Sequence, residues 1–436
     1  MNGIFFAIVA LAFAIAGFRQ IVWSPDSLDE MTPMEVLSLA MVDSAGNAVT
    51  LAIGLVGVMA LFLGLMKVAE AGGLLVIIAH TVRPLMTRLF PDVPADHPAM
   101  GAMILNMSAN VLGLGNAATP FGIRAMQELD KLNPHKGTAS NAMALFLAIN
   151  TSSVTLLPTG IIALRAAAGS EDPAGILPST LFATIVSTTV AIVSVKLYQR
   201  IWPVPGAGES PLPEEGARAP GPALPDDAAR LQGGTAEGYP AWVSLLVLAG
   251  IAALVPLTIL YGRVISPWII PGLVVALLAF GLGRKVAVYE VFVEGAKDGF
   301  QVALRIIPYL VAILVAVGMF RASGAMEMLV EPLGRVTNLF GLPPEALSMA
   351  LLRPLSGSGA YGLVASVIED PATGPDSYTG YLVSTLQGST ETTFYVIAVY
   401  FGAVQVRRIR HTLAAGLTAD FAAVVAAVII CSILFA

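Results

Sequence analysis

The chain has 436 residues, of which 56% are hydrophobic and only 12% are charged. Soluble domains carry about 25% charged residues, so half that share leaves too few to cover a surface that faces water. The single cysteine excludes a disulfide scaffold, and a net charge of −6 without a basic stripe argues against nucleic-acid binding. The composition predicts an all-α polytopic membrane protein.

Nine apolar runs of the sequence are each long enough for a transmembrane helix, which needs about 20 mostly apolar residues. In chain order they are Gly3–Val22, Ala48–Met66, Asn141–Leu164, Ile176–Leu197, Tyr239–Leu260, Ile265–Leu282, Ala303–Phe320, Tyr381–Val404 and Thr412–Phe435. The first run lacks a preceding basic stretch and a convincing small-residue cleavage site. We therefore interpret it as a helix and not as a signal peptide.

The charges of the short loops predict the orientation, because cytoplasmic loops are enriched in Lys and Arg. The loop Pro25–Asp43 is acidic and contains no Lys or Arg, whereas the next connection carries Lys67, Arg83 and Arg88. Placing the basic connections in the cytoplasm puts the N-terminus inside and the C-terminus outside. The main exceptions, which remain outside, are Arg165, Arg263, Arg321 and Arg335.

One long stretch of the sequence, Pro203–Gly238, differs in kind from the rest. It consists mostly of Pro, Gly, Ala, Glu and Asp, and such a composition cannot bury a core. We interpret it as a flexible cytoplasmic linker. It divides the chain into a first half, residues 1–202, and a second half, residues 239–436.

Each half contains an apolar segment that is interrupted by polar residues, glycine and proline. These segments are Met100–Gly122 and Ala346–Ile368. Broken backbone at membrane depth must be packed in protein or line a cavity, so we interpret both segments as re-entrant helical hairpins. A loop or an interfacial helix is the alternative for the first. Snorkelling of Arg353 to the interface is the alternative for the arginine in the second.

A predicted full-length helix with a polar patch follows each hairpin. The helices are Asn141–Leu164 and Tyr381–Val404, and an ungapped alignment of their patches pairs Asn150 with Gln387. The order of parts is the same in both halves, which indicates a duplication, and the loop charges give the two copies opposite orientations. Inverted repeats whose broken helices meet near the midplane are a transporter design.

The candidate binding residues are the polar side chains of these four segments. Glu391 is the one acid near the middle of its predicted span, and Arg353 is its candidate counter-ion, with a purely structural pair as the alternative. Asp420, on the last span, is a second candidate acid or a tie between that helix and the bundle. The predicted site comprises Asn106, Ser108, Asn110, Asn116, Asn150, Thr151, Ser152, Ser153, Arg353, Ser356, Ser358, Gln387, Ser389, Thr390, Glu391 and Thr392.

The sequence contains no recognisable catalytic set. Its histidines lack metal-ligand spacing: they are His80, His97, His135 and His411. The glycine-rich pieces lack the Lys-Ser/Thr of a phosphate loop. We expect no enzyme, no metal site and no cofactor; Na⁺ is the one candidate ion, because the neighbours of Glu391 are rich in oxygen.

Two sets of motifs resemble known proteins. The segment Asn106–Gly122 resembles the signature of spore maturation protein A. The segments Arg353–Ala360, Gly374–Ser377 and Gln387–Val396 resemble spore maturation protein B. The resemblance covers nearly all of both halves and implies a natural fusion, with residues 1–202 similar to protein A and residues 239–436 similar to protein B.

Both of these proteins belong to the nucleoside recognition, or Gate, group, which is similar to the concentrative nucleoside transporters. The resemblance implies two oppositely oriented re-entrant hairpins, an elevator motion and a place in the bacterial cytoplasmic (inner) membrane. It also implies nucleoside and ion contacts from a Gln-Thr-Glu motif, which Gln387–Glu391 matches with an interposed Gly-Ser.

We therefore expect an elevator-type secondary transporter of a small polar solute, for example a nucleoside, coupled to Na⁺ or H⁺. The alternatives are a non-transporting assembly module of the cell envelope and a passive channel. The expected partners are the solute and the lipid bilayer, with no nucleic acid. A homo-oligomer would supply the fixed scaffold that an elevator needs.

Overall fold

The computed structural model describes residues 2–24, 31–113, 115–203, 239–325, 328 and 331–435. Within these residues the regular structure is almost entirely α-helical, and the one β contact is an isolated bridge between Thr138 and Arg408. This is the architecture expected of a polytopic membrane protein. Residues 204–238, nearly all of the predicted linker, lie outside the described part of the chain.

The helices follow the same order in both halves. Each half has a long helix, a short helix, a pair of helices, a broken helix and a closing helix. The first half contains α1 (Asn2–Ile21), α2 (Pro33–Ala71), α3 (Leu74–Leu89), α4 (Pro98–Val111), α5 (Gly115–Leu132), α6 (Asn141–Thr151), α7 (Thr159–Ala167), the 3₁₀ helix η1 (Pro173–Ile176) and α8 (Leu177–Tyr198). The second contains α10 (Ala241–Gly283), α11 (Val288–Ala322), α12 (Glu331–Asn338), α13 (Pro344–Leu352), α14 (Gly357–Glu369), α15 (Tyr378–Ser389), α16 (Thr393–Gly402) and α17 (Thr412–Phe435).

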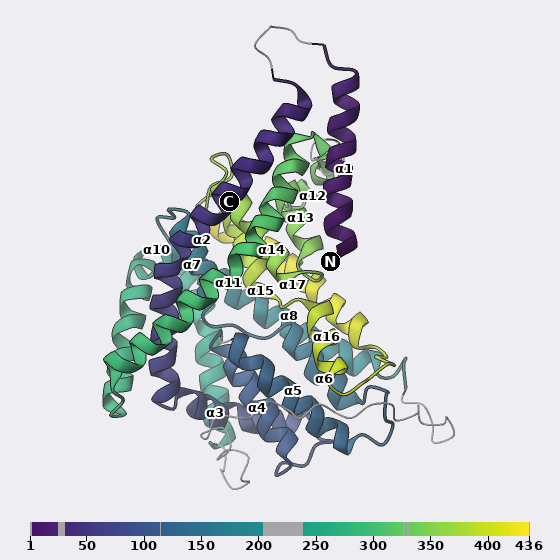
Figure 1. Cartoon of the computed structure of the whole chain (residues 1–436). Coiled ribbons are helices and arrows are strands. Elements are labelled where there is room, and N and C mark those ends of the chain that lie inside the picture. Colours follow the sequence, from purple (N-terminus) through teal and green to yellow (C-terminus); the bar gives the residue numbers. More distant parts are fainter. Residues whose placement is uncertain are drawn as a thin grey trace.

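The two interrupted segments form helical pairs in different parts of the molecule. In Figure 1, α4 and α5 lie in the lower part of the view, whereas α13 and α14 lie above its middle. Their breaks fall inside the predicted segments, at Leu112–Gly113 in the first pair and at Arg353–Ser356 in the second. Both predicted interruptions are therefore present, while re-entrance from opposite sides of a membrane stays a prediction.

The two halves share one interior. α2 and α11 pack along each other (Figure 1), and small residues allow their close approach. A Cβ on Gly299 of α11 would come within 2.6 Å of the Met59 carbonyl oxygen of α2. Gly295 and Gly299 thus place a small-xxx-small face against α2, a common way for membrane helices to pack. One apolar core also joins Ile162 of the first half to Val364 of the second.

Not all of the nine predicted spans appear as single apolar helices. By length and composition, two helices of the described chain can cross a membrane, Pro173–Tyr198 and Thr412–Phe435. They match the predicted spans Ile176–Leu197 and Thr412–Phe435. A third is added if the pair Val56–Ala71 and Leu74–Leu89, bent by 70°, counts as one span.

The prediction of two separate spans, Tyr239–Leu260 and Ile265–Leu282, is wrong. One continuous helix, α10, covers both. Residues 261–264, which separate the two predicted runs, contain one glycine, and a lone glycine costs a helix only about 1 kcal/mol relative to alanine.

The prediction of two continuous polar-patched helices is also wrong. Residues Ser152–Pro158 separate α6 from α7, and residues Thr390–Thr392 separate α15 from α16. Ser and Thr side chains compete for the backbone carbonyls of a helix, as the Ser152 hydroxyl does by donating to the Ala148 carbonyl at 2.8 Å. Pro158 has no N–H with which to continue the ladder. The polar patches are therefore the places where both helices unwind.

Candidate functional site

A cavity of about 250 Å³ lies where the four interrupted segments meet. Its walls come from the α4–α5 turn, the break between α6 and α7, the α13–α14 turn and the break between α15 and α16. The lining residues are Asn110, Gly113, Ser153, Thr155, Leu157, Pro158, Thr159, Gly160, Ile161, Arg353, Gly357, Tyr361, Gln387, Gly388, Thr390 and Glu391. Both halves thus contribute to one polar cavity.

In each half, a backbone hydrogen bond joins the hairpin to the broken helix that follows it. In the first half, the Leu156 N–H donates to the Val111 carbonyl at 2.9 Å. In the second, the Phe394 N–H donates to the Pro354 carbonyl at 3.1 Å. The N–H and C=O groups that a continuous helix would have paired internally are used here between segments. The helical pair and the broken helix are therefore joined in the same way in both halves.

The first hairpin turns at Gly113, whose φ of +75° favours glycine. A Cβ at Gly113 would collide with the Leu157 carbonyl. Gly73 has a similar φ of +82°, but nothing lies within 4 Å of its Cβ position. Gly113→Ala is expected to lower the free energy of unfolding by at least 1 kcal/mol more than Gly73→Ala, since overpacking adds roughly 1–3 kcal/mol to the conformational cost. Unfolding titrations in detergent measure the difference, and equal losses would contradict close packing of the turn against the break.

Arg353 is the central side chain of the second hairpin. It is 6% exposed, its Nε donates to the Gln387 carbonyl at 3.2 Å, and its Nη1 donates to the Thr392 hydroxyl at 2.8 Å. Its Nη2 donates to the Thr390 carbonyl. The arginine therefore lies inside the protein, where it holds the unwound α15–α16 segment, and the snorkelling alternative is wrong.

The predicted counter-ion pair is present. The Nη2 of Arg353 and the Oε2 of Glu391 are 3.7 Å apart, while the Glu391 side chain is 52% exposed. The carboxylate thus opens on the cavity and is not enclosed with its partner. The Glu391 N–H donates to the Thr151 carbonyl at 2.8 Å, which connects the two unwound segments behind the cavity.

Three asparagines of the predicted site have described side chains, and all three make hydrogen bonds in or next to the first hairpin. The Asn110 amide, which lines the cavity, donates to the Asn150 side-chain oxygen at 3.0 Å. The Asn106 amide donates to the Ala118 carbonyl at 2.8 Å and to the Tyr400 hydroxyl at 3.3 Å. Asn110 can therefore contact a ligand directly, whereas Asn106 holds α4 against α5 and α16.

Several predicted site residues do not line the cavity and make local hydrogen bonds. The hydroxyls of four of them donate to carbonyls of their own helices: Ser108, Thr151, Ser152 and Ser389. Ser356 caps α14 by accepting from the Gly359 N–H at 3.0 Å. Ser358 is exposed and does not line the cavity, and the side chain of Asn116 lies outside the described residues.

The sequence reasoning missed the cavity residues of α7 and α14. Tyr361 of α14 lines the cavity and donates from its hydroxyl to the Gly160 carbonyl at 3.0 Å. Nothing local marks this tyrosine, since it lies in an apolar run and its partner is 201 residues away. Pro158 did carry a signal, because a proline after a polar patch indicates a helix break.

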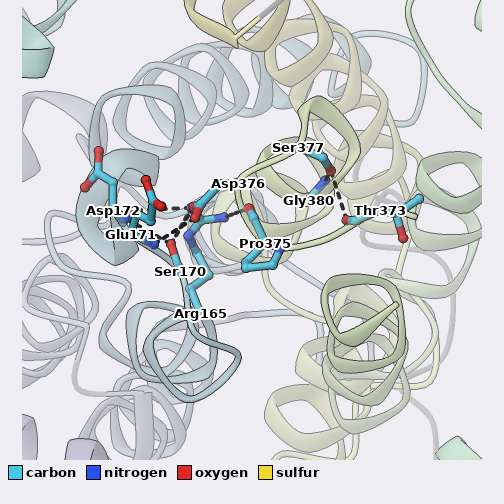
Figure 2. A network of polar contacts seen from close by, with 9 residues as sticks. All are labelled: Arg165, Ser170, Glu171, Asp172, Thr373, Pro375, Asp376, Ser377 and Gly380. Carbon is cyan, nitrogen blue, oxygen red and sulfur yellow. Dashed lines mark hydrogen bonds and ion pairs between the residues drawn. The ribbon is translucent and has the colours of Figure 1, made fainter. Parts of the chain in front are cut away.

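A polar network at one end of the site joins the two halves (Figure 2). The guanidinium of Arg165, which is fully buried, donates to the Pro375 carbonyl and to the Asp376 carboxylate, the latter at 2.9 Å. It also donates to the Ser170 hydroxyl at 3.1 Å and lies 4.2 Å from the ring centroid of Tyr381. Arg165, in the last turn of α7, is thus bonded to the loop that precedes α15. We call these contacts the Arg165 clasp.

A matching contact joins the halves in the opposite sense. Arg410, which follows α16, donates to the Ala139 carbonyl at 2.9 Å and to the side-chain oxygen of Asn141 at 3.0 Å. Those acceptors stand at the beginning of α6. Arg165 within α7 and Arg410 after α16 thus each bond to residues at or just before the beginning of the other broken helix, and we call the second set the Arg410 clasp.

Residues 52–168 and 303–407 match the Gate family, described as nucleoside recognition. These two segments cover about half of the chain, and each contains one hairpin and one broken helix. The chain belongs to the Gate family. In this Gate protein, the matched segments together contain all of the residues that line the cavity.

The Gate protein is also similar to two curated proteins of Bacillus subtilis (strain 168). It is 48% identical to spore maturation protein A over 154 residues, which are 35% of this chain and 79% of that protein. It is 45% identical to spore maturation protein B over 166 residues, which are 38% of this chain and 92% of that protein. A comparison with the solved YdaH transporter of Alcanivorax borkumensis gives a TM-score of 0.42 at 16% identity, over 98% of this chain and 96% of that one.

Proposed function

We propose that this Gate protein is a secondary transporter that carries a small polar solute, with a nucleoside as the first candidate, by an elevator motion coupled to Na⁺ or H⁺. The observation that carries the proposal is the cavity between the two helical pairs, lined by both unwound segments. Such a cavity suits alternating access, because a polar site between two inverted units can be opened from either side. The family description, nucleoside recognition, favours the same solute class.

The chemistry of the cavity suits a neutral solute with several hydroxyl or amide groups. Glu391 offers an accessible carboxylate that can accept hydrogen bonds from hydroxyls, and Asn110 and Gln387 offer neutral amides. Arg353 balances the carboxylate, so the pair leaves no net charge to be neutralised by the solute. In this proposal the two hairpins and the two broken helices move together, while α2 and α11 belong to the fixed scaffold.

Uptake of radiolabelled uridine into proteoliposomes tests the proposal. With an inward Na⁺ or H⁺ gradient, uptake should saturate and exceed that of empty liposomes, and Glu391→Gln should lower the gradient-driven rate at least tenfold. Glu294→Gln is the matched control, since Glu294 is exposed on α11, and it should transport like the wild type. Unchanged coupled uptake in Glu391→Gln would remove this carboxylate from the mechanism.

Two other outcomes would favour the alternatives. Solute flux without saturation, together with single-channel conductance, would indicate a passive channel. Absence of flux, together with no labelling of Ser153→Cys by a water-soluble maleimide, would indicate an assembly module with a closed interior. The native Cys431 is buried, so labelling reports on the introduced thiol at the cavity wall.

A further inference from the structure

A second carboxylate lies behind the cavity, outside the residues that line it. Asp420 of α17 is 6% exposed. Its Oδ2 accepts a hydrogen bond from the Thr393 hydroxyl at 2.7 Å, whereas its buried Oδ1 has no hydrogen-bond partner within the described residues. A buried carboxylate oxygen without a partner is energetically costly unless a proton or a cation accompanies it.

The charges around Asp420 do not balance. Of the charged groups in the described chain, Arg353 is the one that interacts electrostatically with Asp420, and it also interacts with Glu391. One arginine thus faces two carboxylates. A single additional positive charge would neutralise the group.

The surroundings of Asp420 supply oxygen atoms. Gly416 lies one helical turn before it, and a Cβ at Gly416 would come within 2.8 Å of Cγ2 of Thr393 and 3.7 Å of the Thr151 hydroxyl. The glycine therefore lets α17 pack closely against Thr393, and the hydroxyls of Thr393 and Thr151 lie beside this part of α17. Thr151 is the last residue of α6, and the C-terminal end of a helix favours a cation.

We propose that Asp420, with the hydroxyls of Thr151 and Thr393, forms a binding site for one monovalent cation, Na⁺ or H⁺. The site would be the coupling site of the transporter, so this part of the inference rests on the function proposed above. With the cation bound, Asp420 is neutralised and Arg353 pairs with Glu391. Without it, Arg353 is shared between both carboxylates, which loosens its hold on the α15–α16 break. Occupation of the site thus sets the shape of the cavity wall.

Binding of the cation alone can be measured without knowledge of the solute. The melting temperature of the purified full-length protein should rise by about 2–4 °C when choline chloride is replaced by NaCl at constant ionic strength, the shift that about 1 kcal/mol produces in a large domain. If the cation is a proton, the rise should instead follow acidification in choline chloride. In either case Asp420→Asn should abolish the shift and Asp298→Asn, an exposed control on α11, should retain it. A melting-temperature shift in Asp420→Asn as large as that of the wild type would overturn the proposed cation site.

A second variant keeps the test decisive if Asp420→Asn fails to fold. Thr393→Val preserves the side-chain shape and removes one hydroxyl, so it should weaken the apparent cation affinity at least tenfold. Thr189→Val, which alters an exposed residue of α8, should leave the cation affinity unchanged. Equal affinities in Thr393→Val and the wild type would contradict the ligand set.

Transport separates this inference from the proposed function. Asp420→Asn should exchange uridine across the membrane at equal concentrations but should lose acceleration by the Na⁺ or H⁺ gradient. Gradient-driven uptake in Asp420→Asn equal to that of the wild type would overturn the inference and leave the transporter proposal intact. Absence of any uridine flux in the wild type, with the cation-dependent melting shift retained, would overturn the proposed function and leave the cation site intact.

Discussion

Arg353→Met is expected to lower the free energy of unfolding by about 3 kcal/mol and to abolish solute uptake. The substitution leaves the carbonyls of Gln387 and Thr390 without their donor, and each unpaired buried group costs roughly 1–3 kcal/mol. The Thr392 hydroxyl loses its partner as well. Glu391 contributes less to the loss, because its half-exposed carboxylate can be solvated.

The geometry of the guanidinium, and not only its charge, is responsible for this effect. Arg353→Lys keeps the charge, but a single ammonium cannot reproduce three donor directions. We expect it to recover less than half of the lost stability. Arg407→Met is the control, since Arg407 is exposed, and it should change stability by less than about 0.5 kcal/mol. Unfolding by SDS titration in mixed micelles measures all three. If Arg353→Met is as stable as the wild type, the α15–α16 break does not depend on the contacts of Arg353.

The two hairpins were predictable from the sequence because their signals are local. Glycine at a positive φ, as at Gly113, and proline beside polar residues, as at Pro354, interrupt an apolar segment wherever it is placed. The sequence therefore predicted both interruptions, whereas the opposite orientation of the two pairs stays a prediction.

The unwound segments were less predictable, since Ser and Thr clusters are compatible with a helix as well as with a break. The choice depends on distant partners: the Glu391 N–H donates to the Thr151 carbonyl, across 240 positions of sequence. Tyr361 lines the cavity and likewise has a partner far away in sequence, the Gly160 carbonyl. Periodicity and composition contain no information about such pairs.

The charge rule for orientation shows a related limit. Arg165 and Arg321 are exceptions when arginines are only counted. In the structure both are paired with acids from one loop, Arg165 with Asp376 at 2.9 Å and Arg321 with Asp370 at 2.8 Å. The rule counts Lys and Arg and is not a net-charge rule, so these ion pairs do not enter it. The pairing of each arginine is visible only in the fold.

Arg165→Met is expected to lower the free energy of unfolding by about 3–5 kcal/mol, the range for breaking a buried ion pair. The lost contacts include the Asp376 carboxylate, the Pro375 carbonyl and the face of the Tyr381 ring. Asp376 itself would keep two donors, the Ser170 hydroxyl at 2.6 Å and the Glu171 N–H at 2.7 Å. A double-mutant cycle of Arg165→Met with Asp376→Asn should give a coupling of about 1–3 kcal/mol.

The matching variant Arg410→Met should cost less, about 1–2 kcal/mol. Its acceptors at the beginning of α6 are neutral, and Arg410 is only partly buried. This difference follows from the chemistry of the two clasps. A loss in Arg410→Met equal to or larger than that in Arg165→Met would contradict the assignment of the stronger bond to the charged pair.

Hydrogen exchange separates a clasp from a general loss of packing. In Arg165→Met the amides of residues 168–177 and 370–378 should exchange faster, because these segments are held to each other through the clasp. The amides of the α4–α5 pair should exchange at the wild-type rate, since the residues of the Arg165 clasp do not belong to that pair. Local acceleration would mean that the clasp holds the two broken helices together as one unit, as the proposed elevator motion requires of parts that move together. Uniform acceleration throughout the chain would instead mean that Arg165 supports the fold as a whole.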